Sequence, residues 1–195
     1  MIDDPIENEE NLIEWTESCE LSWDDFQGTS RTDMHQALTA ATLRRDITDT
    51  IVFEEKGVFY FRFESLKVKN FFKRNESWVL PKQKTADNHE IILKHEQGHF
   101  DINEIFRRDY QRDLDKLMLR KWECKGNTED ERKQFSLKKG RRLLYKLEKK
   151  FRKKSKEIQD GYDKETNFGL DVKKQFDYLK KIKKQLNLDS QKAEK

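Results

Sequence analysis

Apolar residues recur at intervals of three and four along the middle of the chain, and this spacing limits the fold more than any other feature. In an α-helix such residues share one face, so the spacing predicts a long helix with one buried side. Asp87 or Asn88 is placed to cap its beginning, and we expect it to extend to about Trp122. The residues that form the pattern are Ile91, Ile92, Ile102, Phe106, Tyr110, Leu114, Leu117 and Met118.

The same predicted helix contains the sequence His95-Glu96-Gln97-Gly98-His99. Residues at i and i+4 are neighbours on one helical face, so both imidazoles can reach a single Zn²⁺ ion. Glu96 is then placed to take a proton from a water molecule at the metal. The alternative is that the two histidines only satisfy the polar side of the helix. We favour a zinc site with His95 and His99 as ligands and Glu96 as the catalytic carboxylate.

Gly98 is unusual inside a helix, because glycine there costs about 1 kcal/mol relative to alanine. We therefore expect another part of the chain to pack closely against the helix backbone beside the two histidines. The sequence alone does not identify that neighbour.

The chain has 195 residues, of which 34% are hydrophobic and 41% are charged. Such a composition favours amphipathic helices with one apolar stripe each around a small core. We expect residues 1–11 to be acidic and disordered, residues 12–188 to form a single domain with a helical extension, and residues 189–195 to form a polar tail. No run of about 18 apolar residues is present, so no transmembrane segment is predicted.

Strands are predicted before the histidine helix. Residues 36–48 favour a strand, residues 51–54 and 58–68 are predicted to form a hairpin around Lys56-Gly57, and a further extended segment ends at Pro81. In the second strand of the hairpin, Phe59, Phe61 and Phe63 should share the buried face. The fold class is therefore α+β: a small antiparallel sheet, the histidine helix and a long helical hairpin. This order is that of the zincin metallopeptidases, a likeness at the level of fold alone.

Two further helices are predicted after the histidine helix. One follows Thr128, has Leu137, Leu144, Phe151 and Ile158 seven residues apart, and should pack against the histidine helix as an antiparallel hairpin. We expect Gly161 to Gly169 to break the helical run. The last helix then carries an apolar face that consists of Val172, Phe176, Leu179, Ile182 and Leu186.

Charge is unevenly distributed along the chain. The first 30 residues contain ten acids and no lysine or arginine, whereas residues 131–160 contain thirteen bases and four acids. This basic segment suggests a polyanion-binding helical hairpin as a minor alternative function. Glu148 and Glu157 interrupt the basic segment and its bases do not alternate with a regular set of aromatic residues, so we do not expect nucleic acid as a partner.

Cys19 and Cys124 are the only cysteines, too few for a zinc-ribbon pattern. They are either one disulfide or two free thiols, depending on the compartment. Residues 1–10 are acidic and lack the apolar segment of a signal peptide, which leaves a cytoplasmic protein or a mature exported form as alternatives.

Several segments, taken together and in order, resemble the bacterial DUF922 family of secreted zinc-dependent proteases. The likeness extends over about residues 12–186 and its order and spacing are more specific than the five-residue motif alone. The segments are Leu21-Ser22-Trp23-Asp24-Asp25-Phe26-Gln27-Gly28, Ala41-Thr42, Ser77-Trp78-Val79, His95-Glu96-Gln97-Gly98-His99-Phe100-Asp101-Ile102 and Tyr162-Asp163-Lys164-Glu165-Thr166-Asn167.

The resemblance implies His95 and His99 as zinc ligands, Glu96 as the catalytic residue, a peptide or protein substrate, and secretion or a periplasmic location. In the family pattern a His-Gly pair often follows the Tyr-Asp segment and would supply a third ligand, but this chain has Phe168-Gly169. Phenylalanine cannot bind a metal. Asp163 and Glu165 are the best substitutes, because a catalytic zinc site normally has three protein ligands and a water. Both are alternatively ordinary solvated acids.

Two functions follow from these residues. The first is a zinc-dependent metallopeptidase in which Glu96 acts as general base and a donor such as Tyr162 stabilises the oxyanion. The second is a zincin-like binding or structural protein without turnover, for which Phe168 is the motive. Neither the substrate nor the oligomeric state can be read from the sequence.

Overall fold

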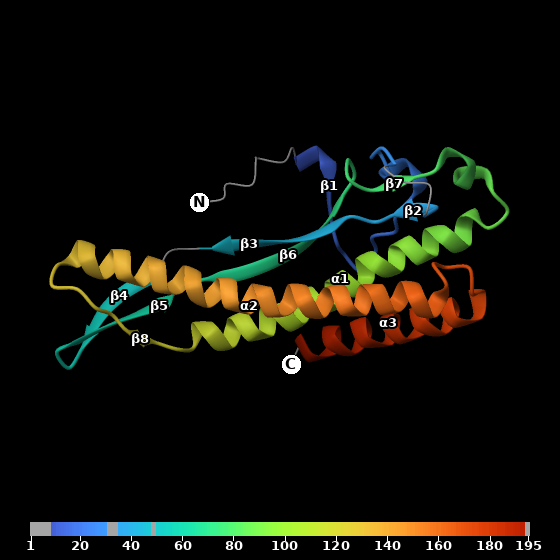
Figure 1. Cartoon of the computed structure of the whole chain (residues 1–195). Coiled ribbons are helices and arrows are strands. Elements are labelled where there is room, and N and C mark those ends of the chain that lie inside the picture. The colour runs from blue at the N-terminus through green and yellow to red at the C-terminus, as the bar shows by residue number, and fades with distance from the viewer. Residues whose placement is uncertain (1–8, 31–34, 48–49, 194–195) are drawn as a thin grey trace. The chain divides into compact units, whose positions relative to one another are not determined.

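The computed structural model describes residues 9–30, 35–47 and 50–193. Its elements comprise three α-helices, three short 3-10 helices and eight strands, in the order shown in Figure 1. The fold is α+β, as predicted. The α-helices are α1 (His89–Met118), α2 (Glu129–Thr166) and α3 (Val172–Ala193). The 3-10 helices are η1 (Glu9–Asn11), η2 (Trp23–Asp25) and η3 (Pro81–Thr85).

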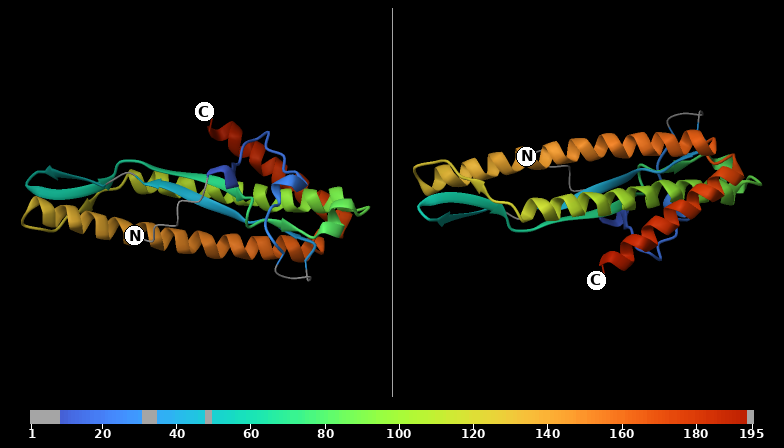
Figure 2. Two further views of the ribbon diagram at one scale, coloured as in Figure 1. Left: turned by 90° about the horizontal axis from the view of Figure 1, so that it is seen from above. Right: turned by 90° about the horizontal axis from the view of Figure 1, so that it is seen from below.

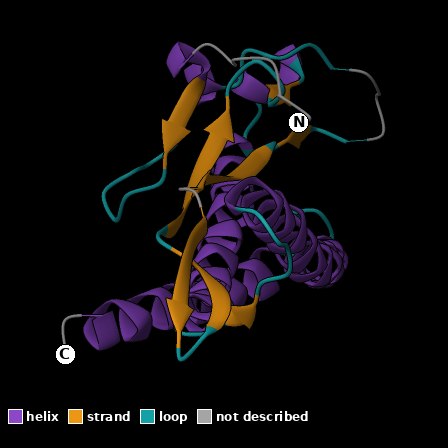
Figure 3. Cartoon of the chain, turned by 90° about the vertical axis from the view of Figure 1, so that its left-hand side faces the viewer, coloured by secondary structure: helices purple, strands orange, loops and turns teal. Residues whose placement is uncertain are grey.

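The strands are short and form three small sheets. Their orders are β1-β6-β3, β2-β7 and β4-β5-β8, and the pairs β1–β6, β2–β7, β4–β5 and β5–β8 are antiparallel. Figure 3 shows the strands and helices in separate colours. The strands are β1 (Leu12–Glu14), β2 (Ala37–Leu38), β3 (Ala41–Ile47), β4 (Thr50–Glu55), β5 (Val58–Phe63), β6 (Leu66–Lys73), β7 (Trp78–Val79) and β8 (Trp122–Glu123).

The chain divides into two compact units, and α1 and α2 each contribute residues to both. Unit 1 comprises Met1–Arg44, Lys69–Ile105 and Glu157–Lys195, and unit 2 comprises Arg45–Val68 and Phe106–Lys156. The sequence predicted one domain over residues 12–188. Among the residues that are described, no helix is long and apolar enough to cross a membrane.

The core of unit 1 lies where the N-terminal segment meets the first half of α1. The ring of Phe26 packs edge-on against Phe72, which in turn packs edge-on against Phe100 on α1. Trp15 and Trp23 pack against this cluster and are half-buried, as expected for anchors of a small core. The buried members of the cluster are Leu21, Phe26, Ala37, Phe72, Val79, Ile92 and Phe100.

Polar contacts also attach the N-terminal segment of unit 1 to α1. The backbone N–H of Leu21 donates to Oε1 of Gln97 at 2.8 Å, and the Trp15 indole donates to Asp101 at 2.9 Å. Gln97 also donates to Asp101 at 2.9 Å, so the two side chains support one another. The polar residues of α1 on either side of His99 therefore have structural roles of their own.

Unit 2 contains the predicted hairpin and the predicted pair of antiparallel helices. In the hairpin Phe61 and Phe63 are buried and Phe59 is half-buried, which agrees with a shared face. The second strand is shorter than predicted, because β5 ends at Phe63 and β6 begins at Leu66. Within this unit, Lys150 of α2 pairs with Asp113 of α1 and Lys154 pairs with Asp109, so the two helices run in opposite directions.

The predicted end of α1 is wrong. The helix ends at Met118, and Trp122–Glu123 pairs with β5 as strand β8 instead of continuing to about Trp122 as helix. The Trp122 ring stacks on Phe61 with 5.3 Å between ring centroids. Burying an indole against the sheet contributes more than the few tenths of a kcal/mol that helix propensity gives a single residue.

The predicted break between Gly161 and Gly169 is also wrong at its beginning. Helix α2 continues through Gly161 and ends at Thr166, so Asp163 lies in a helix and not in a loop. Gly161 costs about 1 kcal/mol in this position. The side chains of Tyr162 and Thr166 are fully buried within unit 1, and their burial offsets that cost.

Helix α3 turns back after α2, and its first turns lie beside the beginning of α1 (Figures 1 and 2). Its predicted apolar face is only partly buried: Ile182 and Leu186 are buried, but Val172 and Phe176 are exposed. The buried residue in the first turn is Gln175, whose Nε2 donates to the carbonyl of Ile91 at 2.7 Å. This hydrogen bond orients the first turn of α3 with Val172 and Phe176 facing outward. Residues 189–193 are helical and not an irregular tail.

Candidate metal centre

Helix α1 brings its two histidines together on the buried side of unit 1. His95 is 2% exposed and lies one turn before His99, as the four-residue spacing requires. Their Nε2 atoms are 3.2 Å apart. The rings meet edge to face, with 4.8 Å between centroids, so both nitrogens are directed at the same point.

Asp163, in the last turns of α2, completes the group. Its Oδ1 lies 2.8 Å from Nε2 of His99 and 3.1 Å from Nε2 of His95. Together His95, His99 and Asp163 form a group that can hold a metal ion. Of the two acids that the sequence offered as substitutes for the missing histidine, Asp163 is in position, whereas Glu165 is exposed to solvent.

The other ring nitrogen of His99 is held by Gln159. Oε1 of Gln159 accepts a hydrogen bond from Nδ1 at 2.5 Å, and Nε2 of Gln159 donates to the carbonyl of His99 at 3.0 Å. The second bond fixes the orientation of the amide, so its oxygen must face the ring and Nδ1 must carry the proton. The lone pair of His99 is therefore on Nε2, toward Asp163 and His95.

Thr166 has the same role for His95. Its hydroxyl donates to the carbonyl of Tyr162 at 2.7 Å, so its oxygen is left to accept from Nδ1 of His95 at 3.4 Å. The proton of His95 is then also on Nδ1. Three atoms that carry lone pairs thus converge in one place, and only a shared cation or protons can hold such acceptors together.

Tyr162 is the neighbour that Gly98 requires, which confirms the prediction of a close approach there. A Cβ atom at Gly98 would lie 2.3 Å from the Tyr162 hydroxyl. The Tyr162 ring stacks on His95 at 4.5 Å between centroids, and its hydroxyl donates to the His95 carbonyl at 3.3 Å. Burial, together with the charges of Glu96 and Asp163, raises the pKa of Tyr162 well above its ordinary value. In this structure the hydroxyl is directed at the helix backbone, so its expected role as an oxyanion donor stays a prediction.

Glu96 is buried next to the group and is only partly satisfied. Its side chain is 4% exposed, and its Oε2 has no hydrogen-bond partner among the described residues. The backbone carbonyl of Glu96 accepts a hydrogen bond from the Thr39 hydroxyl at 3.1 Å. A buried carboxylate oxygen without a partner costs several kcal/mol in principle, so such an atom is typical of a site that takes a polar ligand or water.

The electrostatics of the group are those of an ion pair. Burial lowers the pKa of His99, but the protonated ring donates a hydrogen bond to Asp163, and this bond with the charges of Glu96 and Asp163 outweighs burial, so the net shift of the pKa is upward. Burial raises the pKa of Asp163, and its contacts with His95 and His99 outweigh that effect and lower it well below its usual range. Asp163 is therefore ionised, as a metal ligand must be.

The spacing of the three atoms fits a metal. Metal bonds of about 2.0–2.1 Å in tetrahedral geometry place ligand atoms about 3.3 Å apart. The observed separations of 2.8, 3.1 and 3.2 Å need to widen only slightly. Two imidazoles and one carboxylate form a ligand set found in metalloenzymes, with a further position left for water.

Phe168 follows the metal group but takes no part in it. It has a φ of 54°, is 47% exposed, and its ring lies 5.2 Å from that of His35. Gly169 has a φ of 82°, and a Cβ atom there would be 2.9 Å from the Cβ of His95. The glycine is therefore required for the chain to pass closely behind the histidine ring.

Sequence reasoning missed Gln159 and Thr166. Thr166 belongs to the segment that resembles DUF922, which is a usable signal, but Gln159 lies in a charged helical stretch without any such signal.

Cys19 and Cys124 are both free thiols. Comparisons of the chain with protein-family models, with curated proteins and with solved structures find no match.

Proposed function

We propose that this chain is a zinc-dependent metallopeptidase of the zincin type, and a member of the DUF922 family that its motifs resemble. His95, His99 and Asp163 are the zinc ligands, and Glu96 is the general base. The observation that carries the proposal is the convergence of three metal-binding atoms within 3.2 Å of one another. The unpartnered oxygen of the buried Glu96 supports it.

The chemistry is hydrolysis of a peptide bond. A bound zinc ion supplies a Lewis acid and lowers the pKa of a water molecule toward about 7. Glu96 accepts a proton from the attacking water while the water oxygen adds to the carbonyl carbon of the substrate. Glu96 then returns that proton to the leaving nitrogen as the C–N bond breaks. Gln159 and Thr166 keep the two imidazoles in the tautomer that leaves Nε2 free for the metal.

The substrate and the location rest on the resemblance alone. It supports a peptide or protein substrate and a secreted or periplasmic enzyme, with a cytoplasmic protein as the alternative. Zinc is the metal that we propose, because two neutral imidazoles and a carboxylate would suit it as ligands.

A second candidate is a zincin-like binding or structural protein that does not turn over a substrate. It is favoured by the contact of Asp163 with both imidazoles, because a proton shared within this group would satisfy it without a metal. In that case the polar group would serve to hold the end of α2 against α1 within unit 1.

Elemental analysis of protein purified without a histidine tag, combined with cleavage of an unfolded protein, tests the proposal. We expect about one zinc per chain, retained by Glu96→Gln and lost in Asp163→Asn. Glu96→Gln should reduce cleavage by roughly 100-fold or more, the usual contribution of a general base. The matched control is Glu165→Gln, the same substitution at an exposed position two residues after Asp163. This variant should keep both zinc and activity.

Folded protein that takes up no zinc would instead support the second candidate. Stoichiometric zinc with undiminished cleavage by Glu96→Gln would remove Glu96 from the mechanism while leaving the metal centre in place.

A further inference from the structure

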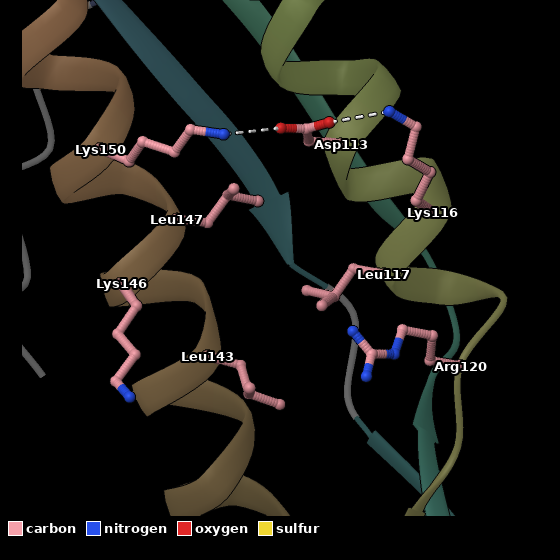
Figure 4. A pocket seen from close by; sticks show the side chains of 8 residues that line it. All are labelled: Asp113, Lys116, Leu117, Arg120, Leu143, Lys146, Leu147 and Lys150. Carbon is pink, nitrogen blue, oxygen red and sulfur yellow. Dashed lines mark hydrogen bonds and ion pairs between the residues drawn. The ribbon is translucent and has the colours of Figure 1, made fainter.

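A groove of about 400 Å³ runs between α1 and α2 within unit 2, outside the metal centre (Figure 4). Helix α2 contributes four residues with the spacing i, i+3, i+4 and i+7, and α1 contributes three with the spacing i, i+3 and i+4, which places each set along one side of its helix. The lining residues are Asp113, Lys116 and Leu117 from the end of α1, Arg120 from the turn that follows it, and Leu143, Lys146, Leu147 and Lys150 from α2.

The groove has an apolar floor. Leu117, Leu143 and Leu147 extend into the space between the two helices and are half-buried (Figure 4). The bases that surround them are more exposed than the leucines, so charges flank the apolar floor. A strip of half-buried leucines between charged rims suits a helix that packs along it, and does not suit a lipid surface, which needs fully exposed apolar side chains.

The rim of the groove is positively charged. It contains four bases and one acid, a net charge of +3. Lys116 and Lys150 share Asp113, at 3.1 and 3.6 Å. Arg120 and Lys146 have no acidic partner in the part of the chain that the structure describes. Two cations are therefore left for the carboxylates of a partner.

We propose that this groove binds an acidic amphipathic helix of a partner protein. Seven residues of helix rise about 10.5 Å, so the groove accommodates about two turns. Apolar side chains at i and i+3 or i+4 of the partner would pack on the three leucines, and glutamates or aspartates beside them would meet Arg120 and Lys146. A third helix between two antiparallel ones is a common helical packing arrangement.

The leucine floor distinguishes this partner from nucleic acid. A phosphate backbone uses bases and backbone N–H groups, and single strands also need aromatic side chains on which to stack. The eight residues that line the groove contain neither an aromatic ring nor an amide side chain. Their combination of apolar floor and cationic rim matches a ligand that is itself apolar on one side and acidic along its flanks.

A set of three labelled helical peptides tests the apolar and the acidic requirement separately. The first carries leucines on one face and glutamates beside them, the second replaces the glutamates with lysines, and the third replaces the leucines with serines. Fluorescence anisotropy with the full-length protein should show binding of the first, and at least about tenfold weaker binding of the other two.

Charge reversal in the groove tests its location. The double variant Arg120→Glu/Lys146→Glu should weaken binding of the first peptide by about tenfold or more. Arg142→Glu/Lys149→Glu makes the same change of charge at two exposed positions of α2 that do not line the groove, and should leave binding within about twofold. Circular dichroism verifies that both variants remain folded.

Three results would overturn the proposal. The first is equal binding of the leucine and serine peptides, which would indicate a general polyanion surface. The second is tighter binding of single-stranded nucleic acid or of anionic vesicles, lost in the groove variant. The third is a dimer that dissociates in the groove variant, because the occupant would then be a second copy of the chain.

Discussion

Units 1 and 2 bury different kinds of side chain, although α1 and α2 contribute to both. Among the described residues, the buried histidine and glutamate side chains, namely His95, Glu96 and Glu104, all lie in unit 1. The single polar residue that is buried in the described part of unit 2 is Ser136, whose hydroxyl bonds to Thr50. No charged residue in the described part of unit 2 is fully buried: the Arg45–Glu148 pair is partly buried, and the bases of the groove between α1 and α2 are exposed.

The same helix shows the contrast directly. In unit 1 the buried side of α1 carries His95 and His99, two of the candidate metal ligands. In unit 2 the buried side of the same helix carries Phe106, Tyr110 and Leu114. Burying ionisable groups costs stability, and apolar residues of similar volume would often be as stable or more so. The difference is the one expected if unit 1 holds the proposed metal ion. The predictions below test that difference, in order of expected size.

The largest effect is expected from adding one methyl group beside the metal centre. Gly98→Ala should destabilise the protein by about 3 kcal/mol, because its Cβ would lie 2.3 Å from the fully buried Tyr162 hydroxyl. Gly161→Ala, also in a helix of unit 1, has no atom within 4 Å and should stabilise it by up to about 1 kcal/mol. Urea unfolding measures both. Equal effects would mean that the contact with Tyr162 does not exist.

A smaller effect is expected from removing support for a histidine. Gln159→Leu should weaken zinc binding by about 10- to 100-fold, because Nδ1 of His99 would lose its hydrogen-bond partner. Gln134→Leu makes the same substitution at an exposed position of α2 in unit 2 and should leave zinc affinity unchanged. Competition with a chromophoric chelator gives both affinities. An unaltered affinity in Gln159→Leu would show that the amide does not orient the ring.

The pH dependence of stability should change sign with metal. The pKa of His99 is raised, so its contribution in metal-free protein is complete below about pH 6.5 and lost as pH rises through the folded pKa. The pKa of Asp163 is lowered, so its contribution persists above about pH 4 and is lost only in stronger acid. One proton accounts for at most about 1.4 kcal/mol per pH unit.

Metal-free protein should therefore lose stability between pH 6 and 8, and Asp163→Asn should flatten that loss. Zinc-loaded protein should gain stability over the same range, because protons and metal compete for the imidazoles. Urea unfolding at both pH values, with zinc or with chelator, measures the two slopes. A single slope under both conditions would argue against metal binding at these histidines.

The smallest effects compare a backbone anchor in unit 1 with a surface ion pair in unit 2. Thr39→Val removes the hydrogen bond to the Glu96 carbonyl and should cost about 1 kcal/mol. Lys121→Met removes the pair with Glu55, in which both side chains are about half exposed, and should cost less than about 0.5 kcal/mol. Thermal unfolding followed by circular dichroism ranks the two, and the reverse order would contradict the contrast between the units.

The features that the sequence predicts correctly depend on the local spacing of residues. The four-residue interval placed His95 beside His99, the isolated Gly98 indicated a close neighbour, and alternation identified the buried face of the hairpin. Asp163 is a candidate because it is an acid in the segment where the resembled family has its third ligand. The predicted loop around it is wrong, because α2 continues through Gly161 to Thr166.

What could not be predicted depended on contacts between distant segments. The end of α1 is set by stacking of Trp122 on Phe61, and the buried side of α3 is set by the bond from Gln175 to Ile91. Gln159 acquires its role only once α2 lies against α1 in unit 1, 60 residues from His99 in sequence. Neither periodicity nor composition contains such pairings.

The proposed metal ligands are 68 residues apart in the chain, from His95 to Asp163. An ion bound there would act as a removable cross-link that closes a loop of that length, and closing so long a loop restricts the unfolded chain more than closing a short one. Metal supply would then determine how long the protein persists. In its absence the end of α2 and the following helix should be the first segments that proteases cut.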